Sequence, residues 1–221
     1  MRRVIAIDGP AASGKSSTAA AVARDLGAHH LDSGALYRGL TRVALDLGSR
    51  DPAAITAEAA RRSLGLRHDG REIVPFLDGD RAEAVIRSEE VTAAVSEVAV
   101  IPALRDWVND RLRAAASDDW VLVLDGRDIG TVVFPQAVLK IFLTATPDAR
   151  ARRRLAQRGE TGDDRLVALE ADRLAARDTL DAGRAVAPLR QAADAVLLDT
   201  THLGFPDQVA TIVALARNAL S

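Results

Sequence analysis

The feature that most constrains this chain is a glycine-rich segment, residues 9–17, directly behind an apolar run at 4–7. The segment reads GPAASGKSS and matches the pattern GxxxxGK[ST]. Its glycines let successive backbone N–H groups face one anion, and the following helix aims its positive end at the same point. The lysine can reach phosphate oxygens, and the next hydroxyl can be offered to Mg²⁺. The sequence therefore predicts a strand, a nucleotide phosphate loop and a helix over about 15–26.

Lysine is rare in this chain, which gives the lysine of the loop more weight. Of the 29 Lys and Arg residues, only Lys15 and Lys140 are lysine. A compact ammonium fits between phosphates inside a tight loop, where a planar guanidinium would not. We therefore expect Lys15 to contact phosphate.

Composition excludes several other classes of protein. The chain has 221 residues, 48% apolar and 27% charged, which is typical of one globular domain. The net charge of −2 argues against general binding to nucleic acid or membrane surfaces. The chain has no cysteine, so it has no disulfide and no thiolate metal site. With neither a signal-peptide pattern nor a long apolar run, we expect a cytoplasmic protein.

Short apolar runs alternate with longer helical stretches along the chain. The strand candidates are 4–7, 29–31, 121–124, 139–143 and 195–198. Except for the short run at 29–31, we expect these strands to be buried on both faces. Asp51-Pro52, Thr146-Pro147 and Phe205-Pro206 are signals that begin helices, the first of which we expect to end near Gly65. The alternation predicts an α/β fold with a doubly wound parallel sheet.

One region breaks this alternation. Residues 64–85 alternate apolar and polar side chains around two Asp-Gly turn dipeptides, which predicts a small antiparallel β unit. Helices are expected over 88–98 and 102–116. We therefore predict a subdomain at about 64–116, inserted into a core made of residues 1–35 and 117–221.

The segment LDSGALYR, residues 31–38, has two interpretations. It can be a capped helix start with Tyr37 in the core. It can also be a second-substrate site in which Ser33 and Arg38 hold a phosphate. The segment by itself does not decide between them.

The segment DGRD, residues 125–128, places an acid at the carboxyl end of a buried strand. Ligands of open α/β sheets gather outside that edge, and an acid there usually serves Mg²⁺. An ordinary charged turn is the alternative. The charged cluster directly behind an apolar strand favours the functional interpretation for Asp125.

Two arginine-rich helical segments complete the pattern. Arg150, Arg154 and Arg158 are four residues apart and share a helix face before an irregular stretch at 159–164. They predict either a solvated face or a lid that brings guanidinium groups to a transferring phosphoryl group. Further along, a helix over 177–184 would turn two arginines and an aspartate the same way, as an internally neutralised face or as ligand contacts.

Taken together, these segments resemble the bacterial cytidylate kinase family of the nucleoside monophosphate (NMP) kinases. The resemblance covers the chain nearly end to end. It is carried by GPxxSGKSS at 9–17, LDSGALYR at 31–38, DGRDIGTVVFP at 125–135, KIFL at 140–143, RARRR at 150–154 and RDxxDxxRAVAPL at 177–189. It implies a monomeric enzyme that phosphorylates CMP and dCMP with ATP and Mg²⁺. It also implies an NMP-binding region at 36–116 and a lid at about 150–170.

The resemblance also implies roles for particular residues. Those expected to bind ATP are Gly9, Pro10, Ala11, Ala12, Ser13, Gly14, Lys15, Ser16 and Ser17. Those expected to bind CMP are Ser33, Tyr37, Arg38, Ser96, Arg105, Arg127, Asp128, Arg177, Asp181 and Arg184. The expected catalytic residues are Lys15, Arg127, Arg154 and Arg158, and the expected Mg²⁺ residues are Ser16 and Asp125. The adjacent His29 and His30 are expected to be structural.

Hydrogen-bonding chemistry agrees with a cytosine site. Cytosine presents a donor at N4 and an acceptor at N3, which Asp128 with Arg105 and Ser96 could match. Uracil reverses both positions and would leave buried groups unpaired. The main alternative is a P-loop ATPase or switch module without a nucleotide acceptor. A switch GTPase would need an Asn-Lys-x-Asp motif, which this sequence does not contain.

Overall fold

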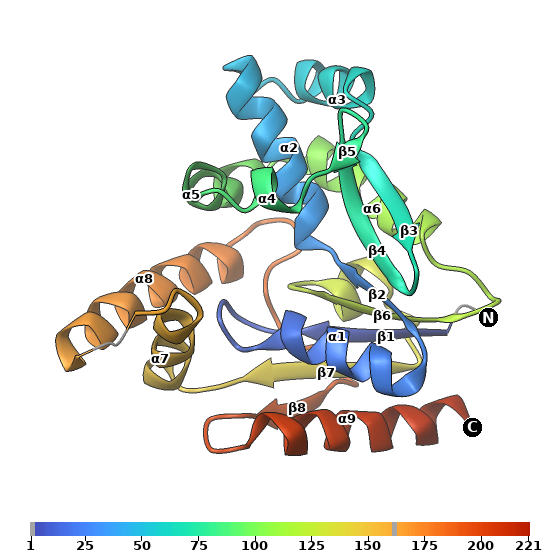
Figure 1. The fold of residues 1–221 in the computed structure, drawn as a ribbon, viewed down its shortest axis with the longest axis vertical. Coiled ribbons are helices and arrows are strands. Elements are labelled where there is room, and N and C mark those ends of the chain that lie inside the picture. The colour runs from blue at the N-terminus through green and yellow to red at the C-terminus, as the bar shows by residue number, and fades with distance from the viewer. Residues whose placement is uncertain (1–2, 161–162) are drawn as a thin grey trace.

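The computed structural model describes residues 3–160 and 163–221, which fold around one eight-stranded sheet (Figure 1). The strands are β1 (Arg3–Asp8), β2 (His29–Asp32), β3 (Gly65–Asp69), β4 (Glu72–Leu77), β5 (Asp80–Arg81), β6 (Val121–Gly126), β7 (Leu139–Thr144) and β8 (Val196–Asp199). The helices are α1 (Lys15–Leu26), α2 (Gly34–Leu47), α3 (Pro52–Arg61), α4 (Glu83–Ile86), α5 (Glu89–Val98), α6 (Pro102–Ala114), α7 (Pro147–Gln157), α8 (Asp164–Ala182) and α9 (Phe205–Leu220). One π-helical turn, η1 (Ile129–Val133), follows β6. Residues 161 and 162 of the expected lid lie outside the described residues.

The centre of the sheet is parallel, as the sequence predicts. β1 lies between β6 and β7, β2 pairs with β6, β8 pairs with β7, and all four pairings are parallel. Each of the five apolar runs forms one of these strands. Their carboxyl ends therefore meet at one edge, and Figure 1 shows α7 and α8 beyond that edge, with both chain ends at the opposite side.

Helices cover both faces of the sheet. Val4 and Ala6 of β1 belong to a hydrophobic cluster with α2, α3, α5 and α6, whereas Ile5 and Ile7 belong to a second cluster with α1 and α9. Successive side chains of a strand point to opposite faces, and β1 and β6 accordingly contribute to both clusters. The doubly wound α/β architecture is confirmed.

The helix starts also follow the predicted signals. Asp51 accepts a hydrogen bond from the backbone N–H of Ala54 at 2.8 Å and caps α3. The end of α3 was predicted wrongly, because the helix stops at Arg61 rather than near Gly65. Ser63 takes a left-handed φ of 53°, which turns the chain from the helix into β3. Neither α4 nor η1 was predicted, because each is a single short turn without periodicity.

The antiparallel unit forms, but it is not separate from the main sheet. β4 pairs antiparallel with β3 and β5, as expected. On its other side β4 pairs in parallel with β2, with His30 opposite Glu72 and Leu31 opposite Ile73. The three strands therefore extend the main sheet, with α5 and α6 following in sequence. The division of the chain into a core and an inserted subdomain stays a prediction.

β8 corrects one expectation about burial. Val196 is 39% exposed and Leu197 is 55% exposed, so this strand is not buried on both faces. β8 is the edge strand beyond β7, and its Leu198 packs against the cluster that includes α9. Within residues 3–160 and 163–221, no helix combines the length and the apolar character that a membrane crossing needs.

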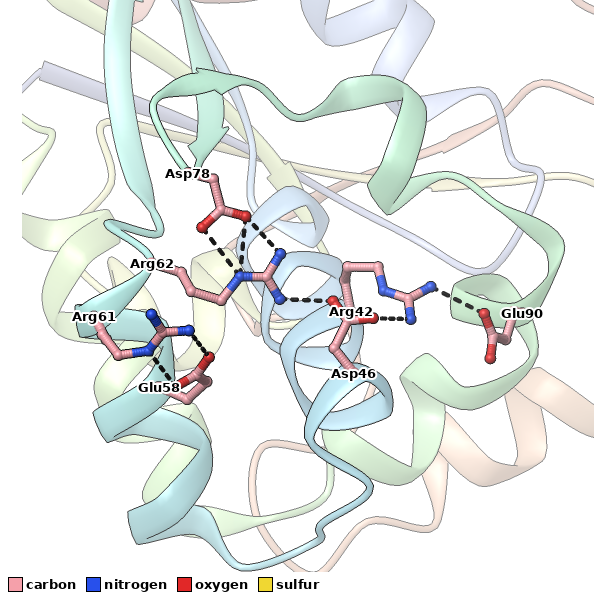
Figure 2. A network of polar contacts seen from close by, with 7 residues as sticks. All are labelled: Arg42, Asp46, Glu58, Arg61, Arg62, Asp78 and Glu90. Carbon is pink, nitrogen blue, oxygen red and sulfur yellow. Dashed lines mark hydrogen bonds and ion pairs between the residues drawn. The ribbon is translucent and has the colours of Figure 1, made fainter.

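A chain of ion pairs joins α2, α5, the end of α3 and the β4–β5 turn, and we refer to it as the surface network (Figure 2). Arg62, just after α3, contacts Asp46 of α2 and Asp78 of the β4–β5 turn, each at 2.6 Å. Arg42 of α2 pairs with the same Asp46 and reaches Glu90 of α5 at 2.9 Å. The surface network therefore links four segments that are distant in sequence.

Candidate active site

A cavity of about 430 Å³ opens at the carboxyl edge of the sheet, between the glycine-rich loop and helices α2, α5, α6, α7 and α8. Most of the predicted site residues line it. They are Ala11, Ala12, Gly14, Lys15, Ser16, Ser17, Ser33, Tyr37, Arg38, Ser96, Arg105, Asp125, Arg127, Asp128, Arg154, Arg177, Asp181 and Arg184. The predicted residues that do not line it are Gly9, Pro10, Ser13 and Arg158. Segments from residue 11 to residue 184 thus converge on one space.

The glycine-rich loop wraps the first turn of α1. Gly14 takes a φ of 87°, a left-handed conformation that favours glycine, and α1 begins at the next residue. Lys15 Nζ donates a hydrogen bond to the carbonyl of Pro10 at 3.1 Å. Burial lowers the pKa of Lys15 to about 7, with the positive charge of Arg127 acting in the same direction. An anion bound beside Lys15 would stabilise its charged form.

An ion pair from α7 and α8 braces the same loop. Asp178 Oδ1 accepts from the backbone N–H of Ala11 at 2.9 Å, and its other oxygen contacts Arg150 Nη1 at 2.5 Å. Arg150 also donates to the carbonyl of Ala11 at 2.9 Å. This pair therefore fixes both backbone groups of one loop residue from outside the loop.

Oxygen atoms suited to a divalent cation lie beside Lys15. Ser16 Oγ donates a hydrogen bond to Asp125 Oδ2 at 2.5 Å. Asp32, the last residue of β2, is paired with Asp125 in the neighbouring strand β6. Burial raises the pKa of Asp32, and the nearby charge of Asp125 raises it further. Mg²⁺ is commonly held by one or two carboxylates together with water and phosphate oxygens. A hydroxyl and two crowded carboxylates fit such an ion, which would also relieve their repulsion.

Several arginines surround the middle of the cavity. Burial lowers the pKa of Arg38 to about 10, and the charge of Arg177 contributes to that shift. Burial also lowers the pKa of Arg177, together with the charge of Arg127. Arg127 Nε donates to Asp181 Oδ2 at 2.8 Å, and Arg184 contacts the other oxygen of that carboxylate. Positive charge exceeds negative charge here, so phosphate groups would be attracted.

Ser33 lies against the backbone that carries these groups. Its Oγ donates to the carbonyl of Asp125 at 2.7 Å. A Cβ atom at Gly126 would lie 2.6 Å from Ser33 Oγ, so a glycine is required for this close approach. The turn after β6 and the start of α2 are thereby held together.

The far end of the cavity contains a buried ion pair. Arg105 Nη2 contacts Asp128 Oδ2 at 2.5 Å, and the two side chains are 2% and 7% exposed. Burial raises the pKa of Asp128, although the charge of Arg105 acts against that shift. The Tyr37 ring lies 5.3 Å from the Arg105 guanidinium, and its hydroxyl is buried without a hydrogen-bond partner. These groups offer donors and acceptors to a planar polar ligand.

The three arginines that the sequence placed on one face of α7 have different surroundings in the structure. Arg150 is buried against Asp178, whereas Arg154 reaches the cavity. Arg158 lies outside the cavity and donates to Glu170 of α8 at 3.2 Å. Spacing alone could not separate them, because the partners come from α8. The role predicted for Arg158 would require it to leave Glu170.

Sequence reasoning missed three residues at this edge. Asp32 and Arg87 line the cavity and form an ion pair at 2.9 Å. His30, expected to be structural, contacts Asp125 Oδ1 through Nε2 at 3.1 Å. The one available signal was spacing: in a strand, residues 30 and 32 share a face.

A glycine-rich phosphate loop at the carboxyl edge of a doubly wound parallel sheet, with an arginine-lined cavity beside it, defines the class of P-loop nucleotide-binding proteins. The model of the family "Cytidylate kinase" matches residues 5–218. The chain therefore belongs to the cytidylate kinase family.

Named relatives agree with this family. A cytidylate kinase of Nocardia farcinica is 46% identical over 218 residues, covering 96% of this chain and 93% of the relative. One of Stutzerimonas stutzeri is 43% identical over 215 residues, covering 96% and 93%. A solved structure of an uncharacterized protein from Eubacterium ventriosum has a TM-score of 0.50 at 9% identity, covering 98% and 99% of the two chains. That last similarity concerns the fold alone.

Proposed function

We propose that this chain transfers the γ-phosphoryl group of ATP to CMP, and also to dCMP. The observation that carries the proposal is that one cavity runs from Lys15 to the buried Arg105–Asp128 pair. A donor nucleotide at the phosphate loop and an acceptor at the far end would therefore meet at the arginines between them. Membership of the cytidylate kinase family supports the choice of acceptor.

The geometry supports direct in-line transfer. The attacking atom is an oxygen of the CMP phosphate, which is already ionised at pH 7, so no general base is required. Catalysis then consists of positioning and of neutralising charge. Lys15 would contact the donor phosphates, and Arg38, Arg127 and Arg177 would hold the acceptor phosphate. Arg154 reaches the cavity and would stabilise the transferring group.

Ser16 and Asp125 are the residues we propose to hold Mg²⁺, with Asp32 beside them. When bound, the ion would neutralise charge on the donor phosphates. Asp181, which pairs with both Arg127 and Arg184, would accept a hydrogen bond from the sugar. Burial would raise the pKa of Asp181, but the charges of Arg127 and Arg184 outweigh burial, and the net pKa is lowered.

Asp128 and Arg105 would read the cytosine edge, with Ser96 nearby in the cavity lining. Cytosine donates from N4 and accepts at N3, whereas uracil reverses both. Each buried group left unpaired costs about 1–3 kcal/mol. Selection of CMP over UMP would follow from this mismatch.

The test is an ADP-release assay with MgATP and a panel of acceptors. The panel contains the nucleotides CMP, dCMP, UMP, AMP and GMP, and shikimate as an acceptor that is not a nucleotide. We expect strong turnover with CMP and dCMP, weak turnover with UMP and none with the other acceptors. ADP release that ignores every acceptor would instead identify a P-loop ATPase or switch module. The proposal includes a cytoplasmic monomer acting on free nucleotides rather than on nucleic acid or membranes, and sedimentation would measure the oligomeric state.

A further inference from the structure

His30 lies on the sheet face that carries the two carboxylates of the cavity edge. The register pairs His30 with Val123, and Asp32 with Asp125, in the parallel β2–β6 ladder. Residues paired in a parallel ladder, and residues two apart in a strand, share one face. His30 therefore sits one step behind Asp125 and Asp32, on the face that α1 covers.

The Asp125 carboxylate is held at both of its oxygens. Ser16 Oγ donates to Oδ2 at 2.5 Å, and His30 Nε2 lies 3.1 Å from Oδ1. The Asp125 side chain is 1% exposed and that of His30 is 15% exposed, so water competes little with either contact. A ring that carries its proton on Nε2 donates to Oδ1 and fixes the rotation of the carboxylate.

The nearby charges make this contact important. Asp32 lies close enough to Asp125 for the charge of Asp125 to raise the pKa of Asp32. Two crowded carboxylates repel each other and would turn apart unless each has a partner that holds it in place. Arg87 forms an ion pair with Asp32 at 2.9 Å, and the His30 ring contacts the Asp125 carboxylate.

We propose that His30 is a positioning residue that holds the Asp125 carboxylate, together with Ser16, in the orientation that binds the Mg²⁺ accompanying ATP, directly or through water. The inference rests on the proposed function for its choice of ion. Hydrogen-bond donors behind a metal-binding carboxylate typically change metal affinity 10–100-fold when they are removed.

The neighbouring histidine provides a matched control. His29 points to the other face and packs against Trp120 and His68, with ring centroids 5.1 Å and 5.2 Å away. Its side chain has no part in the cavity lining. His29→Leu therefore removes a histidine from the same strand without touching Asp125.

The experiment measures ATP binding, not turnover. The Kd of ATP is determined by competition with a fluorescent ATP analogue, first in EDTA and then across a MgCl₂ series, for the full chain. Three variants are compared with the wild type and with His29→Leu. His30→Leu removes the donor, His30→Asn carries an amide too short to reach Oδ1, and His30→Gln places an amide nitrogen near the position of Nε2.

We expect His30→Leu and His30→Asn to need about tenfold more Mg²⁺ for the half-maximal gain in ATP affinity. His30→Gln should stay within about threefold of the wild type, and His29→Leu should match it. In EDTA all variants should bind ATP alike. This pattern separates positioning from a structural role, because a folding defect would weaken ATP binding with and without the ion.

Three results would overturn the inference. They are an unchanged Mg²⁺ requirement in both His30→Leu and His30→Asn, an equal loss of ATP affinity in EDTA, and a wild type whose ATP affinity ignores Mg²⁺. If His30→Leu does not fold, the contrast between the Asn and Gln variants still decides. The assay contains no acceptor, so a failure of CMP turnover would reject the proposed function and leave the His30 result standing.

Discussion

Two groups of ion pairs in this protein use the same residue types in different surroundings. In the cavity, Asp128 pairs with Arg105, and Asp181 lies between Arg127 and Arg184, all with little exposure. The surface network of Figure 2 instead ends in exposed acids. Asp78 is 52% exposed and Glu90 is 62% exposed.

The two groups also differ in charge balance. In the surface network, two arginines, Arg42 and Arg62, meet three acids, so no positive charge is left over. The cavity pairs use three arginines for two acids, and further arginines line the same space. Exposed pairs contribute little to stability and are screened by salt, whereas buried charges without partners favour bound anions. Burial and charge balance, not residue type, therefore distinguish the cavity pairs from the surface network.

The largest expected effect of a substitution concerns Lys15. Lys15→Ala should lower turnover with CMP about a thousandfold, because the variant loses the buried cation that we propose contacts the donor phosphates. Lys15→Arg should be similarly impaired, since a planar guanidinium does not fit the loop. The Kd of CMP, measured by calorimetry, should change little in both variants. Near-normal turnover in Lys15→Ala would contradict the role proposed for Lys15 at the donor phosphates.

The second prediction concerns selectivity at the Arg105–Asp128 pair. Asp128→Asn keeps the size of the side chain and replaces one acceptor with a donor. The ratio of kcat/KM for CMP to that for UMP should fall about tenfold or more, equivalent to about 1–3 kcal/mol. Asp78→Asn, in the surface network, is the control and should leave the ratio unchanged. An unchanged ratio in Asp128→Asn would show that this carboxylate does not read the base.

The third prediction concerns Asp8, a buried acid with no arginine partner among its described contacts. Its two carboxylate oxygens accept hydrogen bonds from the backbone N–H groups of Ile129 and Gly130, each at 2.8 Å, and so hold the start of η1 in place. Burial raises the pKa of Asp8 from 3.8 to about 6. The folded state therefore binds this proton more tightly than the unfolded state, and stability falls as pH rises from about 4 to above 6.

Urea unfolding at pH 5 and at pH 7.5 tests this sign. Asp8→Asn cannot titrate, so the stability of the wild type relative to this variant should be about 1 kcal/mol greater at pH 5 than at pH 7.5. The opposite slope would mean that the backbone hydrogen bonds outweigh burial, as the charges of two arginines do at Asp181.

The smallest effect is expected in the surface network. Arg62→Ala removes contacts to Asp46 and Asp78 and should lower the free energy of unfolding by about 1 kcal/mol, less in 1 M NaCl. Arg61→Ala loses only its pair with Glu58 within α3, and the free energy of unfolding should hardly change (Figure 2). A loss of CMP turnover in Arg62→Ala would show that the network does more than stabilise.

Local signals predicted most of the fold because each acts over a few residues. The loop at 9–17, the Asp51 cap and the apolar runs predict α1, the start of α3 and the five parallel strands without reference to residues distant in sequence. The parallel contact of β4 with β2 could not be predicted in this way. It depends on two residue pairs between strands about forty positions apart.

The cavity shows the same division. The sequence alone determined which segments are candidates for phosphate chemistry, since GxxxxGK[ST], DSGALYR and DGRD are recognised from residue type and spacing. Only the tertiary structure decided that Arg150 braces the loop, that Arg158 pairs with Glu170 and that His30 reaches Asp125. The physical reason is that the charge state and the orientation of a side chain depend on burial and on partners. Both are supplied by segments brought together only when the sheet and its covering helices have packed.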